Sequence, residues 1–130
     1  MRTKKLFYIV ILIPLILVSC EKVELGESFE GKVGDKFRVN ANLSFKIESV
    51  HDYRCPKDLM CIWGGGVDLY VKFHKTFSKI DTLISTSDSR KNPITIAGYT
   101  FKVLNVNPYP ETNIFTPQKD FIIEMIILKN

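Results

Sequence analysis

Apolar and polar residues alternate along most of the chain after residue 36. From residue 37 to residue 47 every second side chain is apolar, the pattern of a strand with one buried face. Asn40 and Asn42 favour a turn, so this stretch predicts two strands rather than one. Residues 67–73 alternate in the same way and predict another strand. The apolar positions in the two stretches are Phe37, Val39, Ala41, Leu43, Phe45 and Ile47, then Val67, Leu69, Val71 and Phe73.

Strand signals in the following segment are weaker. Residues 80–85 and 93–97 are short and contain β-branched residues, which favour strands. Ala97-Gly98 predicts a tight turn into a further strand over residues 99–106.

The last part of the chain alternates less clearly. Asn107-Pro108-Tyr109-Pro110 ends the preceding strand, because proline cannot donate to a ladder, and residues 111–119 are expected to form an exposed loop. Residues 121–128 are apolar on both faces apart from Glu124, which predicts a central strand buried on two sides.

These segments together indicate an all-β domain. About seven short strands are separated by Gly, Asn and Pro, and no segment has sustained helical periodicity. We predict an immunoglobulin-like β-sandwich over residues 36–130, with a small β-barrel as the alternative.

The N-terminus has a different pattern. Arg2, Lys4 and Lys5 precede an apolar run over residues 6–18, whose 13 residues are fewer than the roughly 20 that span a bilayer. This layout predicts a signal peptide over residues 1–19. Leu17-Val18-Ser19-Cys20 resembles the lipobox of bacterial lipoproteins, which implies cleavage before Cys20 and a lipid on this cysteine, with a diacylglyceryl group on its sulfur and palmitate as an acyl chain.

The resemblance implies an exported protein held on the bacterial cell envelope by this lipid. The outer membrane is the preferred location, and the face of the membrane stays open. Residues 20–35 are rich in Glu, Lys, Gly and Ser, which predicts a lipidated tether between the membrane and the domain.

The net charge of the mature chain argues against a nucleic-acid partner. Of the 18 cationic residues three precede Cys20, which leaves 15 against 14 acidic residues in the mature chain, a balance of +1. Nucleic-acid binding requires a clustered basic surface, so no nucleic-acid partner is predicted, and membrane attachment is assigned to the lipid alone.

With Cys20 assigned to the lipid, Cys55 and Cys61 remain as a pair. Thiols outside the cytoplasm tend to be oxidised, so a disulfide is predicted, which would stabilise the domain by roughly 2–2.5 kcal/mol. The surrounding segment, from Tyr53 to Gly65, contains R-C-P-x4-C-x-W-G-G. It resembles the R-C-P-x4-C-x-W-[AG]-G motif of small secreted or lipid-anchored bacterial proteins without an assigned activity, which implies a β-rich fold and export.

Two interpretations of this segment stay open. Trp63 could cover the disulfide or the end of the core as a structural lid. Alternatively, Tyr53, Arg54 and Trp63 form a binding patch beside a rigid loop, since Trp, Tyr and Arg dominate interface energetics.

Metal binding and catalysis have less support in the sequence. His51, Cys55, Cys61 and His74 have zinc-ligand types, but their spacing matches no common zinc site, and no metal site is predicted. No nucleophile elbow, phosphate loop or dinucleotide fingerprint is present, so we predict no catalytic residues and no cofactor.

The sequence therefore predicts a lipid-anchored, non-enzymatic envelope module with a binding or structural role and a protein or small-molecule partner. The alternatives are an inhibitor or ligand-binding protein that uses the Cys55–Cys61 loop and Trp63, and a small metal-binding protein.

Overall fold

The computed structural model describes residues 21–130. The predicted signal peptide, the lipobox and Cys20 lie outside these residues. Within residues 21–130 the helical structure is one short 3₁₀ turn, η1 (Gln118–Asp120), and no helix there is long and apolar enough to cross a membrane.

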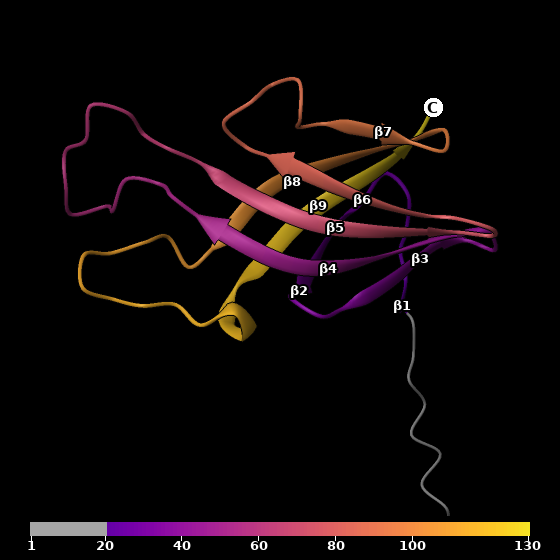
Figure 1. Ribbon diagram of the computed structural model, residues 1–130, viewed down its shortest axis with the longest axis horizontal. Coiled ribbons are helices and arrows are strands. Elements are labelled where there is room, and N and C mark those ends of the chain that lie inside the picture. Colours follow the sequence, from indigo (N-terminus) through magenta and orange to yellow (C-terminus); the bar gives the residue numbers. More distant parts are fainter. Residues whose placement is uncertain (1–20) are drawn as a thin grey trace, which may run out of the picture.

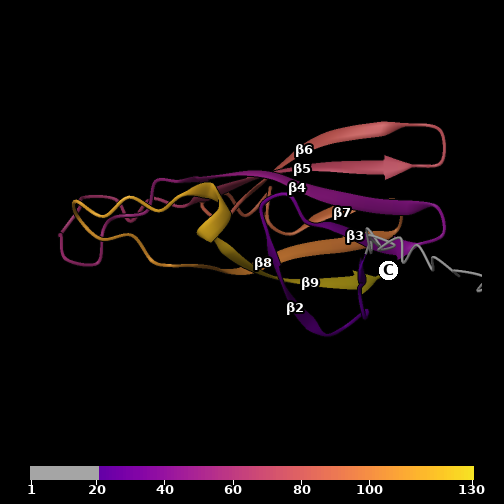
Figure 2. The ribbon, with the colours of Figure 1, turned by 90° about the horizontal axis from the view of Figure 1, so that it is seen from below.

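Two sheets pack face to face as a sandwich and are not closed into a barrel, which confirms the predicted architecture (Figures 1 and 2). The five-stranded sheet has the order β1 (Glu21–Lys22), β3 (Lys36–Asn40), β4 (Leu43–Asp52), β5 (Val67–Lys75) and β6 (Lys79–Ser85). The four-stranded sheet has the order β2 (Ser28–Lys32), β9 (Ile122–Lys129), β8 (Tyr99–Asn107) and β7 (Ile94–Ile96).

The strand order is simple. Strands β3 to β6 follow one another as an antiparallel meander, and β1 joins the edge of β3 in parallel. An immunoglobulin sheet instead has the order A-B-E-D, in which strands B and E lie side by side although they are not consecutive in the sequence. The domain thus shares the sandwich architecture of immunoglobulins and not their strand order.

The segment predicted as a tether belongs to the sandwich. Strand β2 pairs with β9 over five residues, and Phe29 lies 5.1 Å from the ring of Phe37. Val23 is buried, and a side chain on Gly31 would meet the ring of Phe37 at 2.8 Å. The tether prediction is therefore wrong for residues 21–35. Three small or apolar residues, Val23, Phe29 and Gly31, are enough to pack two short strands on the core that the rest of the domain forms.

Phenylalanines form the centre of the core. Phe45 is fully buried and lies 5.3 Å from Phe37, 5.8 Å from Phe73 and 5.6 Å from Phe101, measured between ring centroids. These rings come from both sheets, and every apolar position of the alternating stretches is buried except Ala41, which lies in the turn. The alternation therefore predicted the core correctly.

Strand β9 departs from its prediction. Its inward side chains are buried, but the outer face, with Ile122, Glu124 and Ile126, is only half-buried. The strand is central in its sheet, yet its outer face looks away from the core, so it is not buried on two sides.

Long and short connections lie at opposite ends of the sandwich. Residues 53–66 connect β4 to β5 and residues 108–121 connect β8 to β9, and both connections project from one end, on the left of Figure 1. The opposite end carries tight turns, including the predicted turn at Ala97 and Gly98, which both have positive φ. The predicted binding segment therefore lies in the long connections.

Candidate functional site

The β4–β5 connection begins as an extension of the ladder. The Tyr53 amide donates to the Gly66 carbonyl and the Cys55 amide donates to the Gly64 carbonyl, both at 2.9 Å. The predicted disulfide between Cys55 and Cys61 is present and closes the outer part of the connection, with 5.9 Å between the Cα atoms. The chain therefore carries a stiff, covalently closed loop at the tip of a hairpin.

The first two glycines after Trp63 differ in whether a side chain would fit at their positions. Gly65 has φ +70°, and a Cβ there would lie 2.0 Å from the carbonyl oxygen of Tyr53. Gly64 has ordinary φ, and a Cβ there would meet nothing within 4 Å. A methyl group therefore fits at position 64 and not at position 65.

Arg54 binds within the molecule. Its side chain is only 10% exposed and forms a bidentate pair with Asp52, with Nη2 2.7 Å from Oδ2 and Nε 2.9 Å from Oδ1. It also donates to the carbonyls of Val106 at 2.8 Å and Pro108 at 3.0 Å, and it lies over the ring of Tyr109. Arg54 therefore connects the two long connections and presents little surface to a partner.

The hydroxyl group of Tyr53 is also engaged. It donates to Asp68 at 3.0 Å and lies 2.6 Å from the Ser87 hydroxyl. Its ring lies between His51 and Trp63, at centroid distances of 5.4 and 5.7 Å. The ring of Tyr53 thus packs against the ring of Trp63.

Of the three residues of the predicted patch, Trp63 is the exposed one, with 66% of its surface open to solvent. A lid on the core would be buried. Trp63 instead belongs to a cluster of exposed apolar side chains on the two long connections, which we call the loop platform. Its members are Leu59, Met60, Ile62, Trp63, Tyr109, Ile114 and Phe115.

The loop platform concentrates apolar surface. It holds seven of the twelve large apolar side chains that are exposed in residues 21–130. Met60 and Ile62 are as exposed as in an extended chain, and Phe115 is 87% exposed. Sequence reasoning missed Ile114 and Phe115, although two large apolar residues in a loop bounded by Pro110 and Pro117 were a visible signal.

Hydrogen bonds and an ion pair hold the two connections together. The Lys57 amide donates to the Pro110 carbonyl at 3.0 Å, and the Lys57 ammonium pairs with Glu111. The Thr112 amide donates to Asp58 Oδ1 at 2.9 Å. The two connections that carry the loop platform are therefore fixed to each other, although they lie about 50 residues apart in the sequence.

The contact between Asp58 and Thr112 predicts an acid-sensitive joint. The hydrogen bond from the Thr112 amide lowers the pKa of the Asp58 carboxyl below its ordinary value, with a smaller effect of the Lys57 charge. A lowered folded-state pKa contributes stability above the unfolded-state pKa of about 3.9, and this is lost as pH falls through the folded-state value. The Thr112 amide resonance is expected to shift as the pH falls below the ordinary aspartate value of about 3.9. The same titration of Asp58→Asn should show no such shift, and an equal shift there would disprove the contact.

The residues considered for zinc do not converge. Cys55 and Cys61 are bonded to each other, His51 lies opposite Asp68 near the platform end of β4, and His74 lies opposite Ser44 near the other end of the sheet. Among residues 21–130 no group of three or more His, Cys, Asp or Glu side chains is placed to hold a metal ion.

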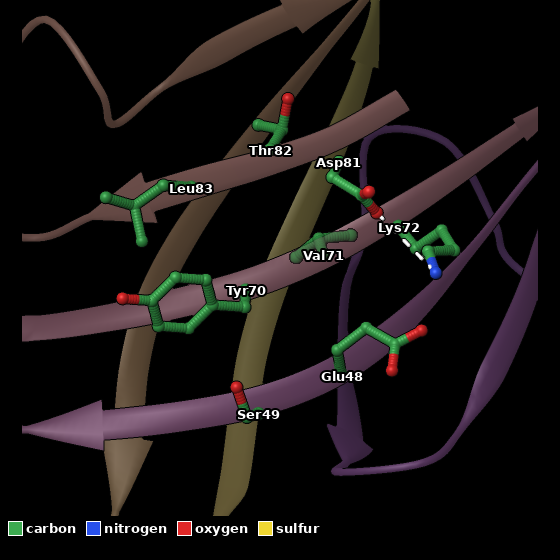
Figure 3. Close-up of a pocket in the computed structure, with 8 residues that line it drawn as sticks. All are labelled: Glu48, Ser49, Tyr70, Val71, Lys72, Asp81, Thr82 and Leu83. Carbon is green, nitrogen blue, oxygen red and sulfur yellow. Dashed lines mark ion pairs between the residues drawn. The ribbon is translucent and has the colours of Figure 1, made fainter. Parts of the chain in front are cut away.

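Two hollows lie near these elements. One, of about 250 Å³, lies under the β8–β9 connection and is lined by Ile114, Phe115 and Phe121 together with the end of β4. The other, of about 480 Å³, is an open groove on the outer face of β4, β5 and β6 (Figure 3).

Comparisons with protein-family models, with curated proteins and with solved structures found no match.

Proposed function

We propose that this protein is a lipid-anchored binding module of the cell envelope that recognises a protein partner through the loop platform. The observation that carries the proposal is the cluster of seven exposed apolar side chains on two connections that are fixed to each other. Exposed apolar side chains are normally scattered singly over a soluble surface, and a concentration of them at one end of a domain marks an interaction site.

The composition and rigidity of the platform fit protein recognition. Trp, Tyr, Phe and Met are enriched in protein interfaces, and aromatic anchors contribute most of their energy. The disulfide, the Arg54 contacts, the hydrogen bond that Lys57 donates and the one that Asp58 accepts fix the platform before binding. Binding a preformed surface costs less conformational entropy, which raises affinity.

The charges around the platform favour a protein cleft over a lipid bilayer. Arg54 is neutralised by Asp52 and Lys57 by Glu111, and Asp58 adds a negative charge. A surface that inserts into anionic lipid needs an excess of Lys and Arg around its apolar tip. Projecting apolar tips with a balanced polar rim instead match a complementary apolar cleft on a protein.

The proposed anchor is compatible with an accessible platform. Strand β1 begins at Glu21, directly after the proposed lipid attachment at Cys20, and Glu21 lies beside Phe37, which pairs with Phe45. Asp52 lies seven residues further along β4, which places the base of the platform roughly 20 Å along the sheet from this point. The lipid would thus hold the edge of the sandwich at the membrane, and the platform projects from one end.

Binding is proposed in preference to catalysis. A disulfide sulfur is not a nucleophile, so Cys55 and Cys61 cannot act as thiolates. The Asp52 carboxylate is occupied by Arg54, and the Tyr53 hydroxyl by Asp68 and Ser87. The polar groups of this end therefore stabilise it from within, and the apolar groups face outward.

Trp63→Ala tests the proposal, with Phe77→Ala as the matched control. Phe77 is 99% exposed in the β5–β6 turn, at the opposite end of the sandwich. Because both aromatic residues are exposed, both variants should keep the melting temperature within about 2 °C of the parent. Only Trp63→Ala should reduce capture of the partner from solubilised envelopes, by about 100-fold in affinity. A large loss of melting temperature with capture retained would instead make Trp63 a structural lid.

A further inference from the structure

The groove on the outer face of the five-stranded sheet has a built amphipathic lining (Figure 3). Tyr70 lies directly opposite Ser49 of β4 and Leu83 of β6, so these three side chains form one row across three strands. Lys72 lies directly opposite Lys46 of β4 and Asp81 of β6, and these three form the next row. The rows are about 7 Å apart, because successive outward side chains on a strand have that spacing.

The first row is an aromatic floor. Tyr70 is 45% exposed. In Figure 3 the face of its ring is turned toward the viewer, and the ring lies along the sheet between Ser49 and Leu83. A ring in this orientation presents its face, which carries negative charge density, to any ligand that lies in the groove.

The second row supplies hydrogen-bonding groups that are loosely paired. Lys72 Nζ lies 3.7 Å from Asp81 Oδ1, and Lys46 Nζ lies 4.0 Å from Glu48 Oε2. Both distances exceed the roughly 2.7–2.9 Å of a charge-assisted hydrogen bond, so these carboxylates have acceptor capacity left. Glu48 reaches the groove because the register shifts between Ile47 and Ser49, and such bulges redirect side chains.

We propose that this groove binds a neutral pyranose sugar. The C–H face of a sugar ring stacks on an aromatic face, and its hydroxyl groups need acceptors and a donor beside that face. Tyr70 supplies the face, Glu48 and Asp81 the acceptors, and Lys72 the donor. A ring stacked on Tyr70 spans the distance to the second row, and the volume of about 480 Å³ holds one or two sugar units.

The charges of the lining decide between neutral and anionic sugars. The carboxylates of Glu48 and Asp81 are matched by the ammonium groups of Lys46 and Lys72, so the charges at the groove balance. Such a lining offers acceptors to hydroxyl groups and leaves no unpaired cation for a carboxylate or a phosphate, which favours a neutral sugar over an acidic one. This site lies on a face of the sheet and not on the loop platform, so it is independent of the proposed protein partner.

The test is a titration of ¹⁵N-labelled residues 21–130, which contain all nine strands and the whole core described above. Glucose, galactose and N-acetylglucosamine serve as neutral probes, and glucuronate as the acidic one. At least one neutral sugar should shift the amide resonances of Ser49, Tyr70 and Leu83 with a Kd of about 1 mM, whereas glucuronate should bind at least about tenfold more weakly.

Tyr70→Ala should raise that Kd at least about tenfold, and Tyr70→Phe should change it by less than about threefold. Phe77→Ala, which removes another exposed aromatic ring outside the groove, should leave it unchanged. Melting curves of the variants check that each is folded. The proposal is overturned if no neutral sugar shifts these amides at about 50 mM, if glucuronate binds as well, or if Tyr70→Ala responds like the parent.

Discussion

Replacing Arg54 with alanine is expected to lower the free energy of unfolding by about 3–5 kcal/mol. The side chains of Arg54 and Asp52 are 10% and 9% exposed, so the change leaves a buried carboxylate without its partner. It also removes the donors that reach the carbonyls of Val106 and Pro108. Chemical denaturation followed by circular dichroism measures the loss.

Two further variants separate the contributions. Arg54→Lys keeps the charge but not the bidentate geometry, so an intermediate loss is expected. Asp52→Asn combined with Arg54→Ala removes the uncompensated charge, so the double variant should be more stable than Arg54→Ala alone. Parental stability of Arg54→Ala, together with lost partner capture, would contradict the internal role and return Arg54 to the binding surface.

Gly65→Ala is expected to destabilise the domain by about 2–4 kcal/mol, whereas Gly64→Ala should change stability by less than about 0.5 kcal/mol. The difference follows from the backbone alone. At Gly65 a Cβ would lie 2.0 Å from the carbonyl oxygen of Tyr53 in a conformation with positive φ, and at Gly64 it would meet nothing within 4 Å.

The adjacent pair is its own control, because both variants add one methyl group to the same loop. Thermal melts of the two proteins, with the disulfide intact, give the comparison. Equal melting temperatures would mean that the connection adopts a different path after Trp63.

The strands could be predicted where alternation is long. Phe37 to Ile47 and Val67 to Phe73 repeat the pattern over enough residues to fix both the element and its buried face. Strand β1 has two residues and β2 has five, with Gly31 on its buried side. Elements this short form only because β3 and β9 offer free edges, which is information that their own sequence does not contain.

The site could be predicted in part. The disulfide follows from the two cysteines, and Trp63 stood out as the single tryptophan. The role of Arg54 could not be predicted from the sequence, because the carbonyl groups that it binds, those of Val106 and Pro108, lie more than 50 residues away along the chain. Only part of the loop platform could be predicted from the sequence, for the same reason. The platform forms where two connections that are distant in the sequence come together.

The most direct test of the loop platform places a photoreactive phenylalanine analogue at Phe115, and separately at Phe77, in the full chain in the cell that produces it. Both positions are exposed phenylalanines, at 87% and 99%. Position 115 lies in the β8–β9 connection and position 77 in the β5–β6 connection, and these two connections are at opposite ends of the sandwich. We expect one discrete protein adduct from position 115, its loss in the Trp63→Ala background, and no such adduct from position 77. Adducts of equal yield from both positions, adducts from position 77 alone, or adducts to lipid alone would contradict recognition of a protein through the loop platform.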